Sequence, residues 1–223
     1  MQTASATDGR IQRGDRTRRQ ILDTAVHIAS VDGLEGLSIG DLAQRLGMSK
    51  SGLFAAFGSK QDLQVATVDH AADIFVEEVV RKGLLAPRGL PRLWSLCDTW
   101  LHYASREVFR GGCFFAATSL EFDGRPGPVK DRIALHMRAW LSTLATAIRK
   151  AQQEEHVRRD VDTEQVVFEL HAIAMGANWA FQLFGDASAF ERARTALRER
   201  IEAVASSGVR LPPSRHSTPR RQR

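Results

Sequence analysis

The chain has only two cysteines, Cys97 and Cys113, among its 223 residues. Their spacing fits neither a metal-binding nor a redox motif and leaves no disulfide framework to infer. No stretch approaches the roughly 20 apolar residues that cross a bilayer, and the polar residues 1–10 contain no apolar core of a signal peptide. With 43% apolar residues, the composition is that of a globular protein with its own hydrophobic core. We therefore expect a cytoplasmic protein that does not associate with a membrane.

The motifs of several common enzyme classes are also missing. The sequence contains no Walker loop, no Gly-x-Gly-x-x-Gly, no His-Glu-x-x-His and no Gly-x-Ser-x-Gly. The Glu-x-x-His pairs that a di-iron helical bundle needs do not occur either. We accordingly expect no catalytic residues, no cofactor and no metal site, although a helical enzyme stays open as an alternative.

Acidic residues are absent from the last sixteen positions, Gly208–Arg223, which hold five arginines. The net charge of +5 comes from this tail, because the rest of the chain has 26 basic and 26 acidic residues. A high overall charge is therefore no evidence that the body of the protein binds nucleic acid. Any case for DNA binding has to come from a local arrangement of residues.

Strand-like alternation is almost absent, and helical periodicity predicts an all-α fold of about nine helices. Thr17 and Gln20 have the spacing of a capping box, which predicts a helix start at this point. Breaks at Gly83–Gly89, Gly111–Gly112 and Asp123–Pro128 separate further helices. The predicted organisation is a disordered N-terminal arm (1–15), a helix-turn-helix domain (16–62), a helical effector-binding and dimerisation domain (63–207) and a disordered basic tail (208–223).

Three long helices are predicted in the C-terminal part. Apolar residues at spacings of three and four mark one face of the first, from Ile133 to Ala151. The segment Val166–Phe184 is apolar nearly all round, which predicts burial on more than one side. The third helix carries a cleaner stripe of Phe190, Ala193, Leu197, Ile201 and Val204. We expect the last two helices to pair with their copies in a second chain as a four-helix bundle.

The segment Ser38–Phe57 carries the functional signal. Two short helices can cross steeply only if Ala43 is small at their crossing and Gly47 adopts a positive φ in the turn. Ser38 and Ser49 stand where the two helices need N-caps. An ordinary helical corner would need only some of these features, and their joint occurrence in one register predicts a helix-turn-helix motif.

The second helix of this motif, Lys50–Ala56, is the candidate recognition helix. In such motifs the N-terminal residues of the second helix face base edges in the major groove. Lys50 is the only long hydrogen-bond donor there, Ser51 can bond to a base or a phosphate, and Gly52 allows close approach of the backbone.

The segment Thr17–Phe75 resembles the DNA-binding domain of the tetracycline-repressor (TetR) family. The matching residues are Thr17-Arg-Arg-Gln-Ile-Leu, Gly33, Leu37-Ser-Ile, Asp41-Leu-Ala, Gly47-Met-Ser-Lys-Ser-Gly-Leu-Phe54, Phe57 and Ser59-Lys-Gln-Asp-Leu63. The resemblance implies a dimer on a palindromic double-stranded operator, with phosphate contacts from Thr17 or Arg18, Ser38, Ser49 and Lys60. Phe54 stands where relatives often have Tyr, so a hydroxyl contact to phosphate is missing there.

The resemblance also implies a ligand pocket in the C-terminal domain. All four tryptophans lie beyond residue 90, and an apolar pocket with a few polar groups suits a small apolar or aromatic effector. The candidate lining residues are Trp100, His136, Trp140, His171, Met175 and Trp179. The predicted function is a repressor that an effector releases from DNA. A constitutive DNA-binding protein without a ligand, with a filled core, stays open as an alternative.

Overall fold

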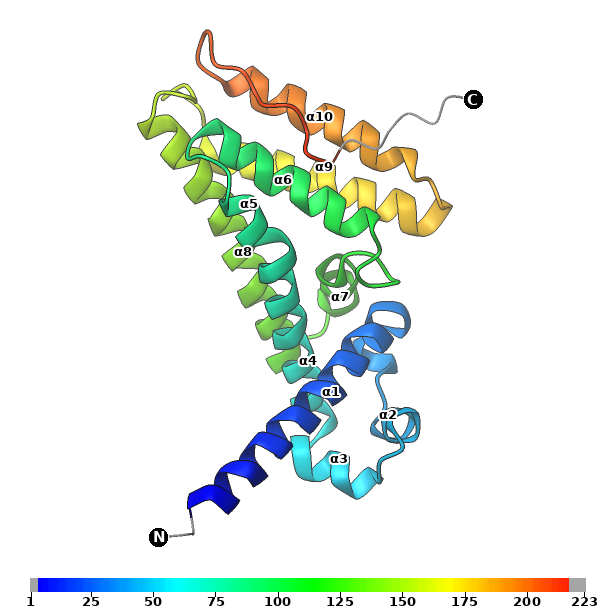
Figure 1. The fold of residues 1–223 in the computed structure, drawn as a ribbon. Coiled ribbons are helices and arrows are strands. Elements are labelled where there is room, and N and C mark those ends of the chain that lie inside the picture. Colours follow the sequence, from blue (N-terminus) through cyan, green and yellow to red (C-terminus); the bar gives the residue numbers. More distant parts are fainter. Residues whose placement is uncertain (1–3, 217–223) are drawn as a thin grey trace. The chain divides into compact units, whose positions relative to one another are not determined.

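The computed structural model describes the backbone of residues 4–216 and the side chains of residues 14–216. Within this range the chain is all-helical, as predicted, and its only strand-like pairing is an isolated bridge between Val157 and Ala205 (Figure 1). The elements are α1 (Ala4–Gly36), α2 (Ile39–Leu46), α3 (Lys50–Phe57), α4 (Lys60–Phe75), the π-helical η1 (Val76–Arg81), α5 (Lys82–Leu84), α6 (Leu90–Ser105), α7 (Phe114–Phe122), α8 (Pro128–Gln153), α9 (Thr163–Phe184) and α10 (Ser188–Val204). Because α4, η1 and α5 follow one another without a break, the described residues form nine continuous helical stretches.

The chain divides into two compact units. Unit 1 comprises the residues through Ala72 together with Phe109–Ile133, and unit 2 comprises Asp73–Val108 together with the residues from Ala134 on. The predicted domain boundary at residue 62 instead falls inside α4. The other difference concerns α7, which was predicted within the C-terminal domain but packs against α1 in unit 1.

Within unit 1, hydrogen bonds from the backbone of α1 to a side chain of α7 hold α7 at the end of α1. The helix α1 breaks at Gly33, where φ is +78°. The Glu121 carboxylate of α7 accepts hydrogen bonds from the backbone N–H groups of Leu34 and Glu35, both at 2.9 Å. These are donors that the turn after a helix break would otherwise leave without partners. Glu121 therefore caps the chain beyond the break and fixes α7 on unit 1.

Unit 2 is built around α6, which is buried along most of its length and contacts both α9 and α10. The predicted face of α8 is confirmed here, since Trp140, Leu144 and Ile148 are buried. Phe75 packs edge-to-face against both Tyr103 and Trp140.

No helix in the described part of the chain is both long and apolar enough to span a membrane.

Three sequence predictions about chain ends differ from the structure. Residues 4–15, predicted as part of a disordered arm, belong to α1. Thr17 is not an N-cap, because α1 already begins at Ala4 and Thr17 lies exposed inside it. The preceding residues include Ala, Arg and Gln, which continue a helix readily. Residues 208–216 of the predicted disordered tail instead dock on unit 2, where Leu211 is buried and Arg198 donates to the carbonyl groups of Leu211 and Pro212 at 3.0 and 2.9 Å. The final arginines of the tail, from residue 220 on, lie outside the described residues.

The apolar stripe of α10 also has a different partner from the one predicted. Leu197 and Ile201 are fully buried within a single chain, and α10 packs on α6 and α9. The stripe therefore belongs to the core of unit 2 and is unavailable as a seam between two chains. Four of the exposed large apolar residues lie on α9: Phe168, Trp179, Leu183 and Phe184 are each more than half exposed.

Candidate nucleic-acid interface

The turn between α2 and α3 has the geometry that the sequence predicts. The Ser38 hydroxyl accepts a hydrogen bond from the Asp41 N–H at 3.0 Å, which caps α2. Gly47 ends α2 in the left-handed region with φ +62°, a conformation that costs a residue with a Cβ about 1 kcal/mol or more. The Ser49 hydroxyl then accepts from the Gly52 N–H at 3.1 Å and caps α3. Three local signals thus fix where one helix stops and the next starts.

A small hydrophobic core holds the two helices against α1 and α4. Leu42 of α2 and Leu53 of α3 are fully buried, and Ala43 is 2% exposed. The core cluster consists of Ile21, Leu22, Ala25, Leu37, Ile39, Leu42, Ala43, Leu53, Phe57 and Leu63. Because α3 buries Leu53 and Phe57 and packs Ala56 against this core, its exposed residues are Lys50, Ser51, Phe54 and Ala55.

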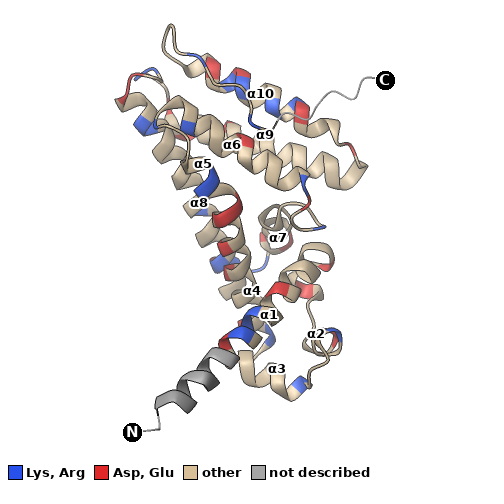
Figure 2. Cartoon of the chain, in the orientation of Figure 1, with Lys and Arg blue, Asp and Glu red and all other residues tan. Residues whose placement is uncertain are grey.

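The solvent-facing side of α3 combines small residues with a single charge. Lys50 and Ser51 are exposed in the first turn, Gly52 is half-buried, and Phe54 is 50% exposed. Figure 2 shows the helix uncharged apart from the basic residue at its start. The Ser49 and Ser51 hydroxyls lie 3.1 Å apart. A surface with a donor, hydroxyl groups and no acid suits base edges and phosphates in a DNA groove.

Arg18 has a structural role that the sequence did not predict. Its guanidinium donates to the Ala56 carbonyl at 2.5 Å and lies 4.3 Å above the ring of Phe57. A cation at the C-terminal end of a helix stabilises the exposed carbonyl groups there. Arg18 therefore fastens the end of α3 to α1. No local pattern could reveal this pair, because the two residues lie 38 positions apart.

Lys60, at the start of α4, is held by Glu35. Its ammonium donates to the Glu35 carbonyl at 2.7 Å and lies 3.4 Å from the Glu35 carboxylate. Desolvation raises the pKa of Glu35, but hydrogen bonds from Gln64 and Lys60 outweigh it and hold this pKa below its ordinary value. The carboxylate stays ionised at neutral pH, so part of the Lys60 charge is balanced inside the protein.

All nine residues predicted to contact DNA lie in unit 1. Thr17 and Arg18 lie on α1, Ser38 and Ser49 cap α2 and α3, and Lys60 starts α4. The remaining four, Lys50, Ser51, Gly52 and Phe54, belong to α3.

The residues predicted to line an effector pocket are only partly brought together. Trp100 is 2% exposed, and its ring centre lies 6.4 Å from that of His171. Burial lowers the pKa of His171, which favours a neutral ring. His136 and Met175 are half-buried. Trp179 differs from the others because it is 55% exposed and packs against Phe184 at the surface of α9.

Comparison with known proteins assigns both parts of the chain to one family. Residues 21–67 match the model of the bacterial regulatory proteins of the tetR family. Residues 89–197 match the tetracyclin repressor-like C-terminal domain. The chain belongs to the TetR family. It is therefore a transcriptional regulator of that family, and the helix-turn-helix of unit 1 is its DNA-binding element.

Individual relatives agree with this assignment. The HTH-type transcriptional repressor AcnR of Corynebacterium jeikeium is 25% identical over 160 residues, which cover 70% of this chain and 77% of AcnR. A TetR transcriptional regulator from Chloroflexus aurantiacus superposes with a TM-score of 0.81 at 24% identity, covering 87% of this chain and 98% of that one. AibR, solved in complex with isovaleryl coenzyme A and operator DNA, superposes with a TM-score of 0.65 at 21% identity over 81% and 95% of the two chains. At these identities, the two solved structures share the fold.

Proposed function

We propose that this TetR-family regulator is a cytoplasmic repressor that binds a palindromic DNA operator as a homodimer and is released by a small apolar or aromatic effector. One observation carries the proposal. Helix α3 is capped at its start and packed on the core of unit 1, and its first turn is exposed and contains no acidic residue. Two relatives support it: AcnR is a repressor, and AibR was solved with both an acyl coenzyme A and operator DNA.

Base contacts would come from the first two turns of α3. Lys50 can reach guanine O6 or N7, or a phosphate, and Ser51 can bond to either kind of group. The exposed ring of Phe54 suits contact with the methyl group of thymine, in place of a hydroxyl contact to phosphate. Lys60 and the caps Ser38 and Ser49 would contact phosphates, which set the position of the helix without reading sequence.

Replacing Lys50 with alanine is expected to change the preference among operator variants by about ten-fold, because a lost base contact affects only the base pair it contacts. Lys60→Ala should instead weaken binding to all duplexes and make the salt dependence shallower by about one unit or less, since Glu35 already balances part of its charge. Fluorescence anisotropy at several salt concentrations measures both effects. Lys150→Ala, on α8 of unit 2, removes the same charge as a control. Unchanged binding by both variants would place the interface elsewhere.

The dimer is proposed to form through α9. Its exposed apolar residues recur as Phe168, Trp179 and Leu183, at spacings that place them on one side of the helix. Charge is confined to the first half of this helix, at Glu164 and Glu169. An exposed apolar face of this kind is typical of a surface that another protein covers.

Replacing Leu183 with glutamate is expected to convert the dimer to monomer at micromolar concentration, because the charge would be buried in the interface. Leu183 is 60% exposed within one chain, so the variant should keep its fold. Sedimentation velocity measures the change. Thr146→Glu, at an exposed position of α8, adds the same charge and should leave the dimer intact. A wild-type monomer, or an unaffected Leu183→Glu dimer, would contradict the α9 interface.

Effector release is proposed to act through α4, which belongs to the helical run that connects the helix-turn-helix to α6. Phe75 of this helix packs on Trp140, one of the predicted effector residues. A ligand can release DNA only if it binds the DNA-incompetent conformation more tightly, and the effect must be reciprocal. Operator DNA should therefore weaken effector binding by the same factor by which effector weakens DNA binding. Titrations of an identified effector with and without operator test this, and equal affinities would contradict the switch.

A further inference from the structure

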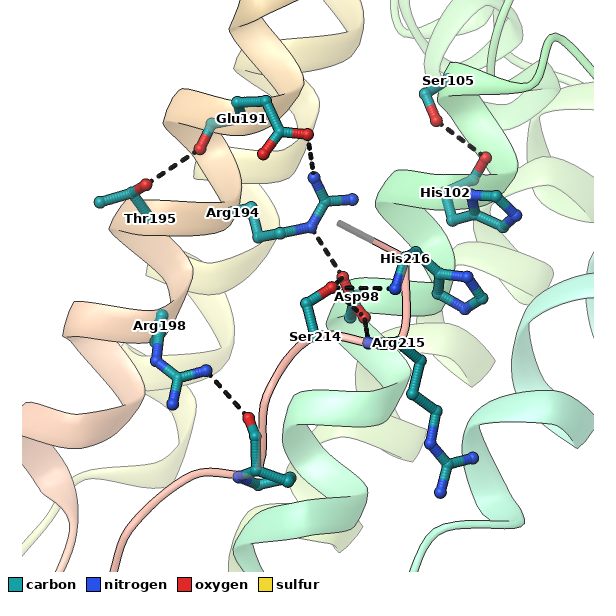
Figure 3. A network of polar contacts seen from close by, with 11 residues as sticks. Asp98, His102, Ser105, Glu191, Arg194, Thr195, Arg198, Ser214, Arg215 and His216 are labelled. Atoms are coloured by element: carbon teal, nitrogen blue, oxygen red, sulfur yellow. Dashed lines mark hydrogen bonds and ion pairs between the residues drawn. The ribbon is translucent and has the colours of Figure 1, made fainter. Parts of the chain in front are cut away.

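The docked tail, residues 208–216, is held to unit 2 by a buried carboxylate (Figure 3). Asp98 of α6 accepts a hydrogen bond from Nε of Arg194 on α10 at 2.8 Å, and both side chains are at least nine-tenths buried. The Ser214 hydroxyl lies 2.9 and 2.8 Å from the two carboxylate oxygens. The Arg215 backbone N–H donates to the same carboxylate at 3.2 Å. The tail is therefore attached to α6 immediately before its last described residue.

Beside this carboxylate, the tail stacks one histidine on another. The His216 N–H donates to the Ser214 hydroxyl at 3.1 Å. The ring of His216 lies against that of His102 on α6, with ring centres 3.9 Å apart and an angle of 6° between the planes. Both residues are half-buried. Two neutral rings can stack at this distance, whereas two imidazolium ions would repel each other.

The charged groups that act on the two rings come from each element packed around them, namely Asp98 and Arg106 of α6, Arg194 of α10 and Arg215 of the tail. Two of the arginines have acidic partners nearby, Glu78 of η1 for Arg106 and Glu191 of α10 for Arg194. The arginines oppose a positive charge on the rings, and Asp98 favours it. Because Arg194 and the tail already engage the Asp98 oxygens, the surroundings favour neutral rings.

We propose that the stacked pair of His102 and His216 makes docking of the tail depend on pH, so that acidification releases the tail from α6 and α10. Protonation would place two positive charges where the docked form stacks two neutral rings. Release would expose Leu211, which is only 6% exposed while the tail is docked. This device lies within unit 2 and does not depend on the repressor function proposed above.

The docked form binds protons at these rings less tightly than free histidine does. Burial is the largest cause and lowers the pKa of His102 to about 4, and the charges of His216 and Arg106 add to the effect. Burial also lowers the pKa of His216, although Asp98 acts in the opposite direction. In an undocked tail the rings meet water, and their pKa values return toward 6.5. Docking is therefore fully favoured above about pH 6.5 and weakens as the pH falls toward about 4.

Hydrogen exchange of the full chain, resolved by NMR at the Arg215 amide, tests the proposal, because this amide donates to Asp98 only in the docked tail. Its protection, corrected for the intrinsic pH dependence of exchange, should fall at least about ten-fold between about pH 7.5 and about pH 5.5, since at least one proton is taken up on release. The amides of α9 should keep their protection, which separates release of the tail from unfolding of unit 2.

Replacing both His102 and His216 with phenylalanine keeps two flat rings and removes both titrating groups. The protection of Arg215 in this double variant should change by less than about two-fold over the same pH range. His27→Phe replaces an exposed histidine of unit 1 and should keep the full ten-fold fall. A fall that persists in the double variant would assign the pH dependence to Asp98 or another group and overturn the proposal, as would wild-type protection that does not fall.

The ring signals of the wild-type protein give a second test that needs no stable variant. The signal of His102 should titrate at least about one pH unit below 6.5, because the docked tail buries the ring and places His216 against it. Titration of His102 at or above about pH 6.5 would contradict the linkage between its charge and the docked tail.

Discussion

Replacing Gly111 with alanine is expected to lower the free energy of unfolding of unit 1 by about 3 kcal/mol, near the upper end for overpacking. A Cβ at this position would lie 1.5 Å from the carbonyl oxygen of Ser30 and 2.5 Å from its carbonyl carbon. Both are backbone atoms of α1, so no side-chain rotation can relieve the clash. The chain leading into α7 would have to separate from α1.

All four tryptophans lie in unit 2, so tryptophan fluorescence does not report on the stability of unit 1 in the Gly111 variant. Hydrogen exchange of the α1 and α7 amides in rising urea reports on unit 1 directly. Gly124→Ala is the matched control, because an added Cβ there meets nothing within 4 Å. If the α1 and α7 amides of Gly111→Ala were as well protected from exchange as those of Gly124→Ala, α7 would not lie on α1 as described.

Replacing Asp98 with alanine is expected to lower the free energy of unfolding of unit 2 by about 3–5 kcal/mol, because the Arg194 guanidinium would stay buried without its main counter-charge. The side chains of Asp98 and Arg194 are 4% and 9% exposed. The same change removes the acceptor for Ser214 and for the Arg215 N–H, so the tail should undock as well.

Urea unfolding followed by tryptophan fluorescence measures the effect of Asp98, since every tryptophan is in unit 2. Asp160→Ala removes an aspartate whose ion pair with Arg158 is exposed, and it should change stability by less than about 1 kcal/mol. Similar midpoints for Asp98→Ala and Asp160→Ala would mean that the buried pair does not hold α6 and α10 together.

The helix-turn-helix could be predicted from sequence because its signals are local. Ser38, Gly47 and Ser49 each act within three or four residues of their own position, through caps and a left-handed turn. The helix breaks at Gly83–Gly89 and Asp123–Pro128 follow from similarly local properties of glycine and proline. The periodicity of α8 was equally informative, since its stripe is buried as expected.

Contacts between distant residues could not be predicted in this way. Glu121 caps a helix break 86 and 87 positions away, and Ser214 meets Asp98 across 116 positions. The stripe of α10 was recognised correctly as buried, but periodicity cannot tell a core within one chain from an interface between two chains. The tail illustrates the same limit: its composition suggests disorder, while Leu211 and Ser214 find partners on α6 and α10 that only the fold brings near.

The most direct test of DNA binding through α3 is a footprint of the full-length protein on an operator selected from random duplexes. Guanine methylation in the major groove should be blocked in two half-sites whose centres lie about 34–36 Å apart on one face of the duplex. Protein carrying Lys50→Ala should lose protection at one base pair in each half-site and keep the rest. Failure to select any duplex, or protection confined to the minor groove, would contradict recognition by this helix.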